Sequence, residues 1–157
     1  MTDPESLRQE YTQSPIILTT ARVLAPFVLT YGLFITFHGA GSPGGGFQGG
    51  VIIATTAYLI AFTFGIDPTR SWVSHRVMKV LAAGGVIIFT GIGLSTIVLG
   101  GNFLEYARFP FFEAQEATKW GMEAVEIGGI AAIIAGVVMA LVFLTAGGYH
   151  TEGGDES

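Results

Sequence analysis

The sequence predicts an all-α, polytopic integral membrane protein with four transmembrane helices, and two observations carry this prediction. Of the 157 residues, 50% are hydrophobic and 12% are charged, whereas an ordinary soluble domain has about 25% charged residues. The charges also cluster in the first dozen residues, in two connections and in the tail, which leaves long stretches with few or none. Helices without a polar face are typical of a lipid environment. Residues 1–157 are therefore expected to form a single membrane domain.

Four stretches are long enough to cross a bilayer, which requires about 20 predominantly apolar residues. The first follows Ser14 and begins with Pro15, and a serine followed by proline suits a helix N-terminus. Pro26 lies inside this stretch and predicts a kink. The four spans are predicted at residues 15–37, 47–66, 80–100 and 122–146.

The connections between the spans differ in character. A glycine-rich loop, residues 39–50, separates the first two spans, because no regular helix is expected to persist through such a composition. Residues 71–79 are predicted to be interfacial. Residues 101–120 form the longest connection and mix charged with aromatic side chains, as is typical of the membrane–water interface. Gly147 and Gly148 are expected to end the last helix, before a polar tail at residues 149–157.

The distribution of lysine and arginine predicts the orientation, since cytoplasmic loops carry an excess of these residues. With the N-terminus inside, five basic residues lie on the inner side and two on the outer side. The inner set is Arg8, Arg22, Arg70, Arg76 and Lys79, and the outer set is Arg108 and Lys119. We therefore expect a multi-pass protein of the cell membrane with both termini in the cytoplasm.

Composition also excludes several function classes. The chain has no cysteine, so it cannot contribute disulfides, zinc–thiolate sites or iron–sulfur ligands. Its net charge of −5 argues against nucleic-acid binding, which requires a basic patch. Residues 1–12 are polar and acidic, so no signal peptide is predicted. We expect no cofactor, no metal site and no enzymatic activity.

A stripe of small residues follows one face of the fourth span. Helices in lipid associate through close packing, and small residues mark the contact faces. The stripe therefore predicts contact with other helices, either within the chain or, as the favoured interpretation, in a partner subunit. It consists of Gly128, Ala132, Gly136 and Ala140.

Two carboxylates at the head of the fourth span are candidates for an ion path. Glu123 and Glu126 stand three residues apart and share one helix face. A carboxylate in a low-dielectric site can bind a proton near neutral pH or ligate a hard cation such as sodium. The alternative is that both residues simply lie where the helix dipole favours negative charge. Spacing alone favours this alternative, and Glu126 is the deeper residue and the better functional candidate.

Two further ionisable residues are ion-path candidates. His38 ends the first span and can relay protons, although a histidine at a helix C-terminus is more often a partner of the helix dipole. Arg22 lies inside the first span. It either pairs with a carboxylate of a neighbouring subunit or extends to the nearer interface as an anchor.

The glycine-rich loop is the most distinctive feature of the sequence. It lacks the lysine of a phosphate-binding loop, and no strand precedes it. Glycine permits a positive φ and close backbone approach, and irregular backbone at membrane depth must be buried in protein or face water. The loop is therefore expected to pack against a partner or to line an aqueous pathway. Its central residues are Pro43, Gly44, Gly45, Gly46, Phe47, Gln48, Gly49 and Gly50.

The same loop carries a resemblance to a known family. Its string PGGGFQGGVI, residues 43–52, resembles the signature of the MnhB subunits of Mrp (Mnh) cation/proton antiporters. The string GNFL, residues 101–104, is similar to that family's Gly-x-Phe-Leu. The acidic-x-glycine that opens its last helix matches residues 126–128, although many relatives have aspartate in the first position. The resemblance covers nearly the whole chain.

The resemblance implies a function that the helix pattern does not. The family forms a small membrane subunit of a multi-subunit complex that exchanges monovalent cations, chiefly Na⁺, for protons. Its partners would be large subunits resembling the proton-pumping subunits of respiratory complex I, together with other small membrane subunits. The MnhB subunit is expected to help assemble the complex and to contribute to the cation path. The first alternative is an ion-translocation module of an archaeal-type membrane-bound hydrogenase or related redox complex, and the second is a purely structural subunit.

Overall fold

The computed structural model describes residues 14–39 and 44–148, and this part of the chain is helical without strands. The elements are α2 (Pro15–Phe37), α3 (Gly46–Phe64), α4 (Ile66–Trp72), α5 (His75–Val98), η1 (Tyr106–Arg108), α6 (Ala114–Ala124), η2 (Val125–Ala131) and α7 (Ala132–Gly148). Four helices are long and apolar enough to cross a membrane: Pro15–Phe37, Gly46–Phe64, His75–Val98 and Ala114–Thr145. The predicted fold class is thereby confirmed. The predicted tail, residues 149–157, and Pro43 of the loop lie outside the described residues.

The starts of the third and fourth spans differ most from the prediction. The third span begins at His75 rather than at residue 80, because Ser74 caps the helix and its Oγ accepts a hydrogen bond from the Val77 backbone N–H at 3.4 Å. The last helix begins at Ala114, so the connection predicted over residues 101–120 is shorter. The first two turns of this helix are polar, so their sequence resembles that of a loop although the segment is helical.

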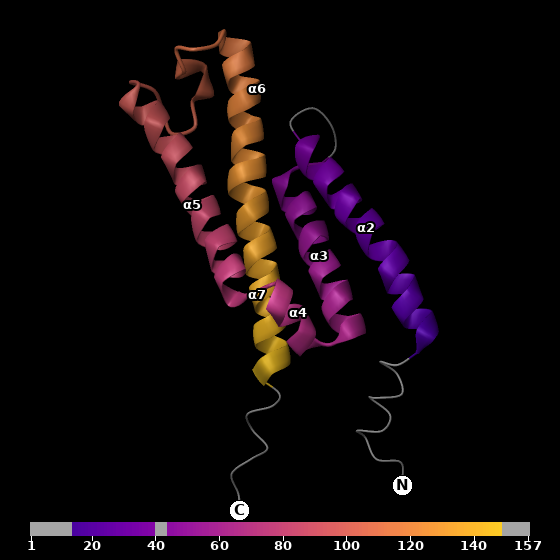
Figure 1. Ribbon diagram of the computed structural model, residues 1–157. Helices are drawn as coiled ribbons and strands as arrows, with labels where there is room; N and C mark the ends of the chain where they lie inside the picture. The colour runs from indigo at the N-terminus through magenta and orange to yellow at the C-terminus, as the bar shows by residue number, and fades with distance from the viewer. Residues whose placement is uncertain (1–13, 40–43, 149–157) are drawn as a thin grey trace, which may run out of the picture.

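The spanning helices lie side by side in a row (Figure 1). The long last helix, made of α6, η2 and α7, lies between α5 on one side and α3 on the other, and α2 packs against the far side of α3. The two outer helices therefore have few neighbours. Only 17% of the apolar window is buried in α2 and in α5, against 39% in α3, so most of their surface is left for lipid or for other subunits.

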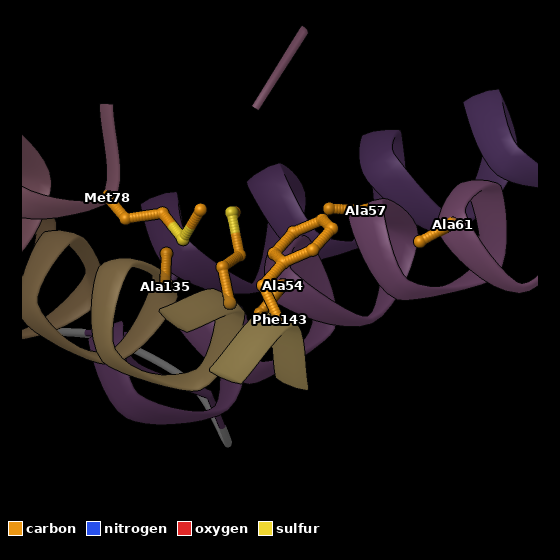
Figure 2. Packing of buried hydrophobic residues seen from close by; sticks show 7 residues of the cluster. Ala54, Ala57, Ala61, Met78, Ala135 and Phe143 are labelled. Atoms are coloured by element: carbon orange, nitrogen blue, oxygen red, sulfur yellow. The ribbon is translucent and has the colours of Figure 1, made fainter. Parts of the chain in front are cut away.

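The hydrophobic core joins α3, α5 and α7. Alanines on α3 leave room for larger side chains of the last helix, so that Phe143 is only 4% exposed. Figure 2 shows this packing from close by. The cluster comprises Ala54, Ala57, Ala61, Met78, Ala135, Met139 and Phe143. Arg70 also links α4 to α7, because its Nη2 donates a hydrogen bond to the Phe143 carbonyl oxygen at 3.0 Å.

The small-residue stripe makes contacts within the chain. A methyl group at Gly136 would lie 2.7 Å from the Met78 carbonyl oxygen of α5, and one at Gly128 would lie 3.3 Å from the Ile88 side chain. Ala132 and Ala140 are half-buried. At Gly128 and Gly136 the stripe therefore brings the last helix close to α5 of the same chain.

Candidate functional site

Glu126 lies where the last helix widens into a π-helical segment. The segment η2, Val125–Ala131, interrupts an otherwise α-helical span. Gly128 and Gly129 lie inside it, and glycine has a low helix propensity. Insertions of π geometry into α-helices are rare and are frequent at functional sites. The geometry therefore sets Glu126 apart from the other acidic residues of the described chain.

Glycines of the loop surround the Glu126 carboxylate. A methyl group at Gly39 would collide with Glu126 Oε2, and one at Gly46 would collide with the Glu126 carbonyl oxygen. Gly45 lies at φ 138°, a conformation that favours glycine, and a methyl group there would lie 3.7 Å from Glu126 Oε1. The carboxylate can occupy this position because Gly39 has no side chain, and the Glu126 backbone can approach α3 because Gly46 has none.

One oxygen of this carboxylate has no protein partner in the described part of the chain. Glu126 as a residue is half-buried, but its Oε2 atom is buried and accepts no hydrogen bond from any described residue. Burying an unpaired ionised group is costly. The position therefore suits a carboxylate that takes up a proton or a cation, or that receives a donor from outside the described residues.

Three further polar side chains lie around the same carboxylate. Gln48 belongs to the first turn of α3, and its Oε1 lies 3.2 Å from the position that a methyl group at Gly45 would occupy. Glu123 lies one turn before Glu126 and acts on it electrostatically. The negative charge of Glu126 also acts on Tyr106. Burial is the main cause that raises the pKa of the Tyr106 phenol above its ordinary value of 10.0, and the charge of Glu126 is the second.

Tyr106 was not predicted as a site residue. It lies twenty residues from Glu126 in a long connection, and no regular spacing links the two positions. Its ring reaches the last helix because Gly121 has no side chain; a methyl group there would collide with the Tyr106 ring. A glycine inside a polar helical turn is the sequence signal that predicts such a close contact.

The structure places His38 at the same end of α2 as the loop. It is the C-cap residue of α2, its backbone N–H donates to the Phe34 carbonyl oxygen, and its ring stacks on Phe34 with centroids 4.1 Å apart. Its Nδ1 lies 3.0 Å from the same carbonyl oxygen. These contacts are those of a helix-terminal residue.

Arg22 does not lie near Glu126. Its guanidinium group lies 5.4 Å from the centroid of the Phe64 ring, at the C-terminal end of α3, whereas the Glu126 carbonyl oxygen contacts Gly46 at the N-terminal end. A helix of this length separates the two by roughly 27 Å. The structure therefore divides the four ion-path candidates between two ends of the row.

The predicted loop, residues 39–50, and the predicted second span, residues 47–66, overlap, and the structure agrees with the span in the overlap. Residues 46–50 form the first turn of α3, which corrects the loop boundaries predicted as 39–50. Gly49 lies against Thr36 of α2, and a methyl group at Gly50 would lie 2.8 Å from the Ala131 carbonyl oxygen of η2. Close packing on both sides overrides the low helix propensity of glycine. Phe47 and Gln48 are exposed, and Gly44 is half-buried.

The chain matches known proteins over most of its length. A family model described as "Domain related to MnhB subunit of Na+/H+ antiporter" matches residues 16–148. An uncharacterized protein of Methanocaldococcus jannaschii is 33% identical over 67% of this chain, which spans 40% of that protein. A Na(+)/H(+) antiporter subunit of Bacillus subtilis, of the B type, is 24% identical over 87% of this chain and 95% of its own length.

A further relative agrees with this assignment. The corresponding Na(+)/H(+) antiporter subunit of Alkalihalophilus pseudofirmus is 27% identical over 83% of this chain and 91% of its own length. The resemblance predicted from the loop string is therefore confirmed. Since the family model covers far more than half of the residues, the chain belongs to the family of domains related to the MnhB subunit of Na⁺/H⁺ antiporters.

Proposed function

We propose that this chain is a membrane subunit of a multi-subunit Na⁺/H⁺ antiporter. The family membership supports this function, as do relatives of similar length that are named as Na⁺/H⁺ antiporter subunits. The same relatives favour an antiporter over a hydrogenase module. The chain acts as a transporter subunit rather than as an enzyme, in the cell membrane with both termini in the cytoplasm. Its partners are complex-I-like large subunits and other small membrane subunits.

The buried oxygen of Glu126 carries the second part of the proposal. Glu126 binds a transported ion, either a proton or Na⁺, in the space bordered by the loop glycines. This assignment rests on the lack of a hydrogen-bond partner for Oε2 among the described residues and on the collision that any side chain at Gly39 would cause. A hard cation prefers oxygen ligands, and Gln48 offers a neutral amide oxygen close by.

Tyr106 supports the same role as a neutral group. Because burial and the charge of Glu126 raise its pKa, the phenol keeps its proton throughout the physiological range. It therefore leaves Glu126 as the group that changes charge. Glu123, one turn nearer the start of the helix, contributes electrostatic repulsion to the site.

Replacing Glu126 with glutamine tests the proposal. Glu126→Gln keeps the size of the side chain but removes its ability to hold a charge. We expect the complex to assemble normally and Na⁺-dependent proton movement in inverted membrane vesicles to fall about tenfold or more, since an intramembrane carboxylate of this kind is commonly functional.

Glu123→Gln is the matched control. It removes the same charge three residues away, on the same helix face, and we expect a much smaller change in transport. If Glu126→Gln transports like the unchanged protein, the chain is a structural subunit and Glu126 is not in the ion path. If neither variant assembles, Glu126→Asp, which keeps the charge, provides the comparison: recovery of both assembly and transport supports the proposal, and loss of both contradicts it.

A further inference from the structure

A cavity of about 420 Å³ lies at the end of the row away from Glu126. It is formed by α2, α3 and α4, and it is partly open to the surroundings. Ala25, Ile60 and Phe64 contribute apolar walls, while Arg22 and Trp72 lie at its border. Its volume falls within the range of about 300–1,000 Å³ that is typical of pockets for small ligands.

Arg22 brings one positive charge to this apolar cavity. It lies seven residues after Pro15, roughly 10 Å along the helix axis, inside the first spanning helix. The Phe64 ring lies under its guanidinium group, an arrangement that is favourable for a cation. Among the acidic side chains that the structure describes, a set that leaves out Asp67 of α4, none forms an ion pair with Arg22. A charge at this depth requires an anion or contact with the interface.

The cavity has few other polar side chains. Thr69 also lines the cavity, but its hydroxyl donates to the Gly65 carbonyl oxygen at 2.8 Å. A bound peptide would need both donors and acceptors for its backbone, and the described side chains of the cavity offer chiefly donors, the Arg22 guanidinium group and the Trp72 indole N–H. A ligand with one anionic group and a long apolar part therefore fits this cavity better than a peptide does.

The charged side chains that the structure describes around the cavity are basic. Arg70 of α4 and Arg76 and Lys79 at the start of α5 lie at the same end of the row, and Trp72 is 87% exposed beside them. The glutamates of the described helices and loops lie at the opposite end. Basic residues near a membrane surface attract anionic lipids, and exposed tryptophan is typical of the headgroup level.

We propose that this cavity binds an anionic phospholipid. One acyl chain lies along the walls formed by Ile60 and Phe64, the phosphate pairs with Arg22, and the glycerol region lies beside Trp72. The site is separate from Glu126, and the proposal does not depend on the transport role of that residue.

Lipid retention by the purified complex tests this proposal. The complex is stripped with mild detergent, incubated with palmitoyl-oleoyl phosphatidylglycerol or with the matching phosphatidylcholine, and analysed by native mass spectrometry. We expect the unchanged protein to retain phosphatidylglycerol in preference to phosphatidylcholine. Arg22→Gln should weaken this retention about fivefold, which corresponds to the loss of one charge pair at a membrane surface.

Two matched variants separate the site from general electrostatics. Lys79→Gln removes one positive charge from the same end but outside the cavity, and retention should fall much less than in Arg22→Gln. Ile60→Trp fills the apolar part of the cavity, and both lipids should be lost. Equal losses of lipid retention in Arg22→Gln and Lys79→Gln would show that the lipid is held by general electrostatic attraction and not by a specific site, which would contradict the proposal. Unchanged retention in Arg22→Gln would overturn the proposal.

One further outcome would also overturn it. If the assembled complex retains no phosphatidylglycerol on this subunit, the cavity is not a lipid site. Glu126→Gln should retain lipid like the unchanged protein whatever its transport activity. The failure of the lipid proposal and the failure of the transport proposal can therefore be distinguished.

Discussion

Two glutamates of this chain occupy opposite environments. Glu105 lies in the connection after α5, and its Oε2 accepts hydrogen bonds from the backbone N–H and the side-chain amide of Asn102 at 2.7 and 3.0 Å. Its Oε1 accepts a third hydrogen bond from Arg108 Nε at 3.1 Å. Glu126 Oε2, by contrast, is buried without a partner among the described residues. Full pairing indicates a structural role for Glu105, and the lack of pairing supports an ion-binding role for Glu126.

The stability of the connection around Glu105 should depend on pH. The hydrogen bond from the Asn102 backbone lowers the pKa of Glu105 below its ordinary value of 4.5. A carboxylate whose pKa is lower in the folded state than in the unfolded state stabilises the fold at any pH above its unfolded-state pKa. This stabilisation is lost as the pH falls through its folded-state pKa. We therefore expect the exchange protection of the Asn102 amide to decrease as pH falls below 4.5. Glu105→Gln should show the reduced protection already at neutral pH, and a protection factor that is constant across this range would contradict the role.

At the scale of the elements, glycine determines how closely the helices approach. A methyl group at Gly85 of α5 would lie 2.7 Å from the Gly129 carbonyl oxygen of η2, whereas its neighbour Gly84 faces open space. At Gly49, a methyl group would collide with Thr36 Oγ1 of α2. Small residues at such positions allow van der Waals contact between backbones, which is the main source of helix association in lipid.

Adjacent glycines of α5 provide a matched pair of variants. Gly85→Ala should lower stability by roughly 1–3 kcal/mol, because the added carbon forces α5 away from η2. Gly84→Ala should leave stability unchanged or raise it by up to about 1 kcal/mol through its better helix propensity. Thermal unfolding of the purified chain in detergent measures both. Equal effects of the two variants would show that the helices are not in close contact at Gly85.

The loop glycines should matter for assembly in the same way. Gly45→Ala combined with Gly49→Ala introduces a side chain at φ 138° and a collision with Thr36. We expect the double variant to lose copurification with the other antiporter subunits, as measured by pull-down in mild detergent. Gly84→Ala is again the control. An intact complex in the double variant would show that the packing of the loop is not needed for assembly.

Several elements could be predicted from the sequence, and others could not. The long apolar runs with few charges are sufficient to locate four spans, because such runs are typical of helices that cross a membrane. The polar start of the last helix at Ala114 was missed, because its charged residues suit a loop equally well. The π-helical turn around Glu126 depends on close packing with α3 and α5, which no local pattern encodes. The loop string was likewise sufficient to identify the family, but it could not predict that Gly39 lies against Glu126, because this contact depends on the packing of distant segments.

At the scale of the whole molecule, the row of helices leaves two broad faces for lipid or other subunits (Figure 1). The order within the row could not be predicted, because small residues occur on several helix faces and each can accept a neighbour. The separation of Arg22 from Glu126 has a simpler origin. Both lie in the N-terminal half of a spanning helix, and the two helices run in opposite directions within the row.

The orientation of the row can be measured directly, because the chain has no cysteine of its own. Ala107→Cys places a thiol in the connection near Glu126, and Ser71→Cys places one in α4; both positions are exposed. With the termini in the cytoplasm, a membrane-impermeant maleimide should label Ala107→Cys in intact cells and Ser71→Cys only after permeabilisation. The reverse pattern would show that the row has the opposite orientation.

The central position of the last helix has a consequence for biogenesis. The helix α5 packs against η2 and α7 rather than against α3, yet it leaves the ribosome before either of them. The α2–α3 pair can therefore form early, whereas α5 must remain in the bilayer without its partner until synthesis reaches the C-terminal third of the chain. A chain truncated before Ala114 would leave one helical pair and one solitary helix, which is a form that membrane quality control can recognise.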